Sequence, residues 1–113
     1  MSWTARHRFA RISARKARLL TDVIRGRFCD EAVELLRFSP KRAAFLLGRV
    51  LKSAMASANE AEAAMSRLVV QEARVDDGPI VKRFRPKDRG RAHPIQKRTS
   101  HIIVSVAERG AAR

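Results

Sequence analysis

The chain has 113 residues, of which 45% are hydrophobic and 32% are charged, and its formal net charge is +14 at pH 7. This length favours one domain with a modest core, and the sequence offers neither the roughly 20-residue apolar run of a membrane span nor the apolar block of a secretory signal. The single cysteine, Cys29, excludes an internal disulfide framework, fits a reducing compartment and is expected to be a buried, inert thiol.

The positive charge is concentrated towards the two ends of the chain. Residues 1–27 hold eight Lys or Arg and one acid, residues 28–77 hold seven and eight, and residues 78–113 hold ten and two, so the net charges are +7, −1 and +8. Mixed charges of both signs are typical of an ordinary solvated surface, whereas nearly acid-free segments repel themselves and oppose folding. A polyanionic partner is the simpler interpretation, and nucleic acid is the commonest one.

The first predicted element is a short strand within residues 3–12. One side of this strand is expected to hold Trp3, Ala5, His7 and Phe9. The other side, a basic outer face, is expected to hold Thr4, Arg6 and Arg8.

A helix is predicted next, with Ser13 as its N-cap and Gly26 as its C′ residue. Its apolar stripe at helical spacing is Ala17, Leu20, Val23 and Ile24. Another face carries Arg11, Arg15, Arg18, Asp22 and Arg25. An exposed charged face is the ordinary interpretation, but this one continues the basic strand, which favours an anion-facing surface.

Two more helices are predicted before the chain returns to strands. Residues 29–38 have an acidic first turn, which suits a helix N-terminus, and a small apolar patch formed by Ala32, Leu35 and Leu36. Residues 39–60 begin with Ser39 as N-cap and Pro40 at the first helical position, and we expect the central core helix there, with Phe45 in the core. Its core stripe is Ala43, Leu46, Leu47, Val50, Leu51, Ala54, Met55 and Ala58, and its extra basic surface is Lys41, Arg42, Arg49 and Lys52.

The last third of the sequence predicts strands and a long hairpin. Residues 67–78 predict a strand that ends in an Asp-Asp-Gly-Pro turn, and residues 99–107 predict a last strand with Ile102, Val104 and Val106 on one face and Ile103 and Ser105 on the other. Between them we expect a hairpin with its turn at Arg89 and Gly90 and with Phe84 near Ile95. With about 11 residues in each arm it would reach roughly 35 Å.

These elements together predict an α+β fold: three helices packed on a small three-stranded antiparallel sheet, with a long protruding basic β-hairpin. The expected domain has a body (1–78 and 100–108), a hairpin (79–99) and a tail (109–113). The hairpin has little to bury, and two-stranded hairpins are marginal in water. Because Phe84 is its one aromatic residue, the sequence favours recognition of the backbone and shape of a folded nucleic acid over stacking on single-stranded bases.

Several segments resemble the bacterial-type large-subunit ribosomal protein family numbered twenty-two. The resemblance covers nearly the whole chain in order, and the segments that carry it are RISARKARLLTDVIRG (11–26), SPKRAA (39–44), GPIVKRFRPKDRGRA (78–92) and KRTSHIIV (97–104). The chain departs from the family pattern at Ala14, where proline is frequent, at Pro94, where a basic residue is usual, and in a loosely matching segment at 53–63.

The resemblance implies a non-enzymatic structural component of the large ribosomal subunit, cytoplasmic and ribosome-bound, without cofactor or metal. Its partners would be large-subunit rRNA of several domains, neighbouring large-subunit proteins and the nascent polypeptide, with no membrane and no homo-oligomer. The hairpin would thread between rRNA segments and support assembly, and its tip would line the peptide exit tunnel. The tip residues would be Lys87, Asp88, Arg89, Gly90, Arg91, Ala92 and His93.

The expected rRNA-binding residues combine the N-terminal basic surface with the arms of the hairpin. They are Arg6, Arg8, Arg11, Arg15, Lys16, Arg18, Arg25, Lys82, Arg83, Arg85, Lys87, Lys97, Arg98, Thr99, Ser100 and His101.

Two other classes of protein are weighed against this hypothesis. A DNA-architectural protein can carry basic β-arms with an apolar wedge, for which Pro86 or Pro94 would serve, but the sequence shows no obvious dimerisation seam. An enzyme is disfavoured because the acids of residues 30–34 and the three histidines are scattered, with no nucleophile, base and orienting group together. The histidines and the cysteine also lack the close spacing of a zinc site.

Overall fold

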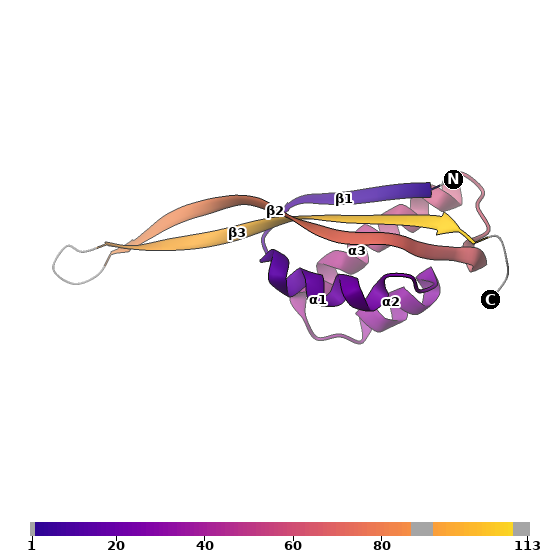
Figure 1. Cartoon of the computed structure of the whole chain (residues 1–113), viewed down its shortest axis with the longest axis horizontal. Coiled ribbons are helices and arrows are strands. Elements are labelled where there is room, and N and C mark those ends of the chain that lie inside the picture. Colours follow the sequence, from indigo (N-terminus) through magenta and orange to yellow (C-terminus); the bar gives the residue numbers. More distant parts are fainter. Residues whose placement is uncertain (1, 87–91, 110–113) are drawn as a thin grey trace.

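The computed structural model describes residues 2–86 and 92–109, and within the arm it describes the backbone alone at 81, 83–86 and 92–96. In chain order the elements are β1 (Ser2–Ala10), α1 (Ala14–Ile24), α2 (Cys29–Arg37), α3 (Arg42–Glu60), a 3-10 turn η1 (Met65–Arg67), β2 (Leu68–Pro86) and β3 (Ala92–Glu108). The three strands form one antiparallel sheet in the order β1-β3-β2, and the helices lie together beside it (Figure 1). The predicted α+β fold, three helices on a three-stranded antiparallel sheet, is confirmed.

Strands β2 and β3 stay paired well beyond the part of the sheet that the helices cover (Figure 1). Strand β1 follows β3 as far as the pair Ala10↔Ser100, whereas β2 follows it to Pro86↔Ala92. The pairs from Ile80↔Arg98 to Pro86↔Ala92 form what we call the arm, about 20 Å long at 3.3 Å per residue. The radius of gyration, 17.3 Å, accordingly exceeds the roughly 13 Å of a compact chain of this length. The predicted turn at Arg89 and Gly90 lies outside the described residues.

The predicted Asp-Asp-Gly-Pro turn is wrong, because β2 runs through this segment with a bulge. Between Asp77 and Ile80 the register shifts by one residue relative to β3. Gly78 permits the close approach this requires, since a Cβ there would lie 2.6 Å from Thr99 Oγ1. The Thr99 hydroxyl also donates a hydrogen bond to the carbonyl of Pro79 at 2.6 Å. An extra residue accommodated in this way bends a strand without ending it.

The predicted register of the hairpin is off by one residue. Phe84 pairs with Pro94, and Ile95 pairs with Arg83.

A second bulge interrupts β1 at the same level of the sheet. Alternation holds from Trp3 to His7, as predicted, but the register then shifts before Ala10. Phe9 takes a positive φ of 59° and points into solvent, so its predicted place on the inner side is wrong. Both bulges therefore flank Ser100 on β3, where the body ends and the arm begins.

The core lies between the helices and the sheet. The predicted stripe of α3 is buried, with Met55 partly so, and the inward face of β3 is fully buried at Ile102, Val104 and Val106. Phe45 is an exception, since it is exposed on α3, and its predicted place in the core is wrong. The N-cap of α3 is Lys41, two residues later than predicted, and Ser39 accepts a hydrogen bond from the Lys41 N–H at 3.4 Å.

The termini of α1 are as predicted, but one residue of its buried stripe is not. Ser13 accepts a hydrogen bond from the Lys16 N–H at 3.4 Å, and Gly26 has a φ of 82° after the last turn. Val23 is exposed and Thr21 is buried in its place. The Thr21 hydroxyl donates to the Arg18 carbonyl at 3.0 Å, which satisfies it in the core.

Helix α2 packs through the predicted Ala32 and Leu36, while Leu35 is exposed. Cys29 is fully buried at its first position, as predicted, and burial together with the charge of Asp30 raises the pKa of the thiol to about 12. The thiol is therefore protonated at neutral pH, and reactive thiolate chemistry is disfavoured there.

Candidate nucleic-acid interface

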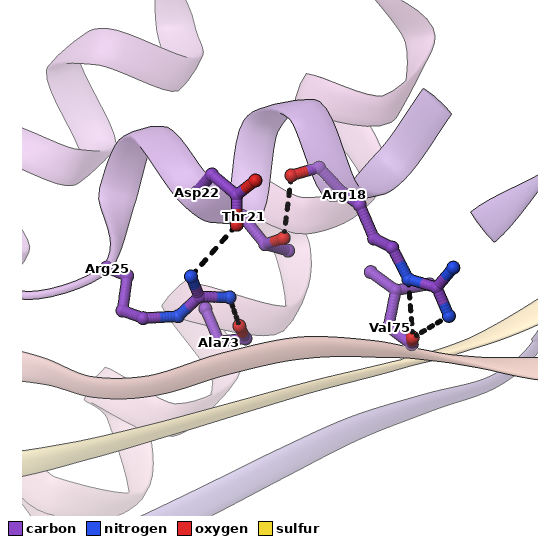
Figure 2. A network of polar contacts seen from close by, with 6 residues as sticks. All are labelled: Arg18, Thr21, Asp22, Arg25, Ala73 and Val75. Atoms are coloured by element: carbon purple, nitrogen blue, oxygen red, sulfur yellow. Dashed lines mark hydrogen bonds and ion pairs between the residues drawn. The ribbon is translucent and has the colours of Figure 1, made fainter. Parts of the chain in front are cut away.

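Two of the predicted RNA-binding arginines hold α1 against the edge strand β2 (Figure 2). Arg18 donates from Nε and Nη2 to the carbonyl of Val75, at 3.2 and 3.0 Å, and Arg25 donates from Nη2 to the carbonyl of Ala73 at 2.5 Å. Because β2 lies at the edge of the sheet, these carbonyls have no further strand among the described residues to pair with. The arginines supply the missing donors, so part of the basic face of α1 acts within the protein.

The contact between α1 and the edge strand continues through charges and backbone. Asp22 accepts from Arg25 at 2.9 Å and fixes its guanidinium (Figure 2), and Arg18 lies 3.7 Å from a carboxylate oxygen of Asp77. After α1, the Gly26 N–H donates to Val70, and the Val70 N–H donates in return to Arg27, each at 2.9 Å. The side chains of Arg18 and Arg25 remain about half exposed, and a guanidinium has five N–H donors, so each keeps donors for an external anion.

Positive charge gathers in a groove of about 700 Å³ at the base of the arm. We call it the arm-base groove. Its described lining is Arg11, Ile12, Ser13, Lys16, Arg42, Lys97 and Arg98. Five of these residues are basic and none is acidic, so the field inside the groove is strongly positive.

Four separate segments bring these cations together. Arg11 follows β1, Lys16 lies in the first turn of α1, Arg42 begins α3, and Lys97 and Arg98 lie where β3 enters the arm. Helices α1 and α3 both begin at this groove, and neither has an acidic residue in its first turn. The partial positive charge of a helix N-terminus adds to the side-chain charges and favours an anion.

Thr99 and Ser100, which the sequence placed among the RNA-binding residues, follow Arg98 in β3 and are buried. The Ser100 hydroxyl donates to the carbonyl of Ile12 at 2.6 Å, and Thr99 bonds to Pro79 across the bulge. These bonds tie β3 to the loop before α1 and to β2. Both side chains therefore position the basic residues around them, and their contact with RNA stays a prediction.

His101 is also engaged within the protein. Its Nδ1 accepts the backbone N–H of Phe9 at 3.1 Å, and the two rings meet edge to face with centroids 5.0 Å apart. This pairing supports the bulge of β1. The guanidinium of Arg8 also lies near Phe9, 5.7 Å from the centre of its ring. The sequence contained no signal for this aromatic pair, because its partners are 92 positions apart.

The remaining predicted residues are dispersed. Arg6 and Arg8 are exposed on β1, Arg15 on α1 and Lys82 on β2. Arg83, Arg85, Ala92 and His93 are placed by their backbone pairing in the arm, and their side chains are outside the described part. The predicted tip residues Lys87, Asp88, Arg89, Gly90 and Arg91 lie outside the described residues.

Arg42 is the member of the groove that the sequence did not single out. The sequence places it among the extra basic surface residues of the helix, because no local pattern reveals which other segments meet the start of that helix. The helix begins at Arg42 itself, and this side chain lines the groove.

Other kinds of site find no support in the described part of the chain. The described residues contain no group of three or more His, Cys, Asp or Glu that could hold a metal ion. Among them, no helix is long and apolar enough to cross a membrane.

A comparison with protein families is consistent with an anion-binding surface at this groove. The family model described as ribosomal protein L22p/L17e matches residues 5–107, which takes in nearly all of the body, the arm and every residue of the arm-base groove. This match covers far more than half of the 113 residues. The chain therefore belongs to the ribosomal protein L22p/L17e family, and it is an rRNA-binding structural protein of the large ribosomal subunit, not an enzyme.

Proposed function

We propose that the arm-base groove is the principal rRNA-binding site of this protein and that it binds the phosphate backbone. The observation that carries the proposal is the convergence of five cations from four segments, with no acid among the described lining residues. Such a cluster opposes folding by its own repulsion unless an anion neutralises it. Phosphates accept hydrogen bonds from Arg and Lys and release counterions on binding.

The arm extends this interface. Its strands pair with each other alone beyond Asp77↔Ser100, and a two-stranded ribbon is marginal in water. Lys82, Lys97 and Arg98 are exposed along it. rRNA segments packed on both sides of the arm would supply the surroundings that the protein does not, and the arm would support subunit assembly by joining them.

Further parts of this proposal follow the family resemblance. The chain would form one domain whose body lies at the outer surface of the subunit. The arm would point inwards, so that residues 87–93 line the peptide exit tunnel and contact the nascent chain. Neighbouring large-subunit proteins would contact the body, and the particle would be cytoplasmic. Deletion of residues 87–93 that abolished subunit incorporation would contradict a role confined to the tunnel.

Removal of single charges tests the groove. Arg98→Gln and Arg42→Gln should each weaken binding to a large-subunit rRNA transcript and lower the slope of log K against log salt by about one unit, because one phosphate contact is lost. The measurement is filter binding between low and moderate salt, with duplex DNA as competitor.

Arg74→Gln is the matched control, because Arg74 is an exposed arginine outside the groove, paired with Glu72 at 2.9 Å. It removes the same net charge and should leave the slope unchanged. Equal losses in all three variants would reduce the effect to overall charge and contradict the proposal. Duplex DNA that competes as well as rRNA would favour the architectural alternative.

A further inference from the structure

A second groove, of about 540 Å³, lies between α2 and α3. We call it the α2–α3 groove. Its described lining includes the aromatic ring of Phe45 and no acidic residue. The basic residues along it are Arg37, Lys41, Arg42, Arg49 and Lys52.

Phe45 is presented to solvent on this groove instead of packing in the core. Its exposed fraction is 66%, and the guanidinium of Arg49, one turn along α3, lies 5.8 Å from the centre of the ring. Between them Gly48 leaves open space, because a Cβ at that position would meet nothing within 4 Å. The lining of the groove therefore combines the flat, apolar ring of Phe45 with several cationic side chains.

The two grooves are neighbours, because Arg42 lines both. An occupant of the arm-base groove that carries repeated negative charge can thus pass into the α2–α3 groove without leaving positive surroundings. RNA fits both features, because its phosphates match the cations and an unstacked base has a flat face that stacks on phenylalanine and on guanidinium planes. An acidic peptide would match the charges alone.

We propose that the α2–α3 groove binds an unstacked nucleotide of an RNA segment that continues from the arm-base groove, with its base stacked on Phe45. Arg49 contacts the same base or its phosphate, and Lys41 and Arg42 carry the backbone between the grooves. This inference rests on the proposed function of the arm-base groove. It adds a binding site for one base to a surface that otherwise contacts only the phosphate backbone of the RNA.

The first test removes the ring. Phe45→Ala should weaken binding of the full chain to a large-subunit rRNA transcript about 5- to 140-fold, the range that loss of one stacked base gives. The salt slope should stay unchanged, because no charge is removed. Phe45→Trp should restore affinity, and the emission of the new tryptophan should be quenched when RNA binds. Phe38→Ala is the control, since Phe38 is 78% exposed but lies outside the described lining of the groove.

The second test fills the groove with a variant that folds at least as well as the parent. Gly48→Glu adds a side chain where a Cβ has free space and raises helix propensity, while it places a carboxylate beside the RNA site. Its affinity for the transcript should fall at least fivefold. Gly48→Ala, the matched control, should bind within twofold of the parent.

The outcomes separate this inference from the proposal on which it rests. If Arg98→Gln weakens binding while Phe45→Ala and Gly48→Glu do not, the arm-base groove stands and the stacking site is wrong. If none of the three weakens binding, both are wrong. If Phe45→Ala binds the transcript normally but is lost from purified large subunits, the groove holds a protein, which overturns the inference.

Discussion

Single residues decide where the sheet of this protein can bulge. Gly78 lies against Thr99 so closely that a Cβ would meet Thr99 Oγ1 at 2.6 Å and the Thr99 backbone at 3.2 Å. On the other edge, Phe9 adopts a left-handed φ of 59°, which is uncommon for a residue with a side chain, and its N–H is bound by His101. These two positions set the level at which the arm leaves the body.

Gly78→Ala should lower the free energy of unfolding by about 1–3 kcal/mol, because the backbone of Thr99 cannot give way as a flexible side chain could. Gly48→Ala should raise it by about 0.5–1 kcal/mol, since space is open there and alanine is the better helix former. Urea denaturation of both variants checks the pair. A Gly78→Ala protein as stable as the parent would contradict the close approach.

Among the elements, α1 has two roles at once. Its buried side fills the core, and its arginines cover the carbonyls of the β2 edge that no strand covers. Covering an edge in this way protects a sheet from pairing with other chains. The basic face of α1 is therefore divided: Arg18 and Arg25 reach the sheet, while Lys16 faces the arm-base groove.

Arg18→Gln should lower the free energy of unfolding by about 1 kcal/mol, because two charge-assisted hydrogen bonds to the Val75 carbonyl are lost at a half-exposed site. Thermal or urea denaturation measures the change. Arg15→Gln is the control, since Arg15 is exposed on the same helix. Equal stability of the two variants would show that the contact with β2 contributes nothing to the free energy of unfolding.

The sequence predicted the elements well wherever the spacing of apolar residues or a helix-capping residue indicates them. The stripe of α3 and the Ser13 cap and Gly26 end of α1 follow from local spacing. The bulges, the burial of Thr99 and Ser100, and the convergence of Arg42 with Arg98 depend on contacts between residues far apart in the chain. The apolar character of the α3 segment likewise placed Phe45 in the core, because a pattern of apolar residues cannot reveal that one ring faces a polar groove.

At the scale of the whole molecule, shape and charge point to the same partner. The chain extends 66 Å along its longest axis and 17 Å along its shortest, and the two cationic grooves lie where the body meets the arm and beside it. A slender and strongly positive protein is stabilised when a large, negatively charged partner surrounds it. Large-subunit rRNA supplies such surroundings, which is consistent with the family to which the chain belongs.

The central claim is that rRNA binds this protein through the arm-base groove, and sedimentation tests it most directly. Tagged full-length protein from a cell lysate is run through sucrose gradients of rising salt, with and without ribonuclease, beside Arg42→Gln/Arg98→Gln and Arg74→Gln. We predict that the parent and Arg74→Gln migrate with the large subunit until ribonuclease releases them, while the double variant dissociates at lower salt. Migration of the parent as free protein, or retention of the double variant at the same salt as the parent, would contradict the claim.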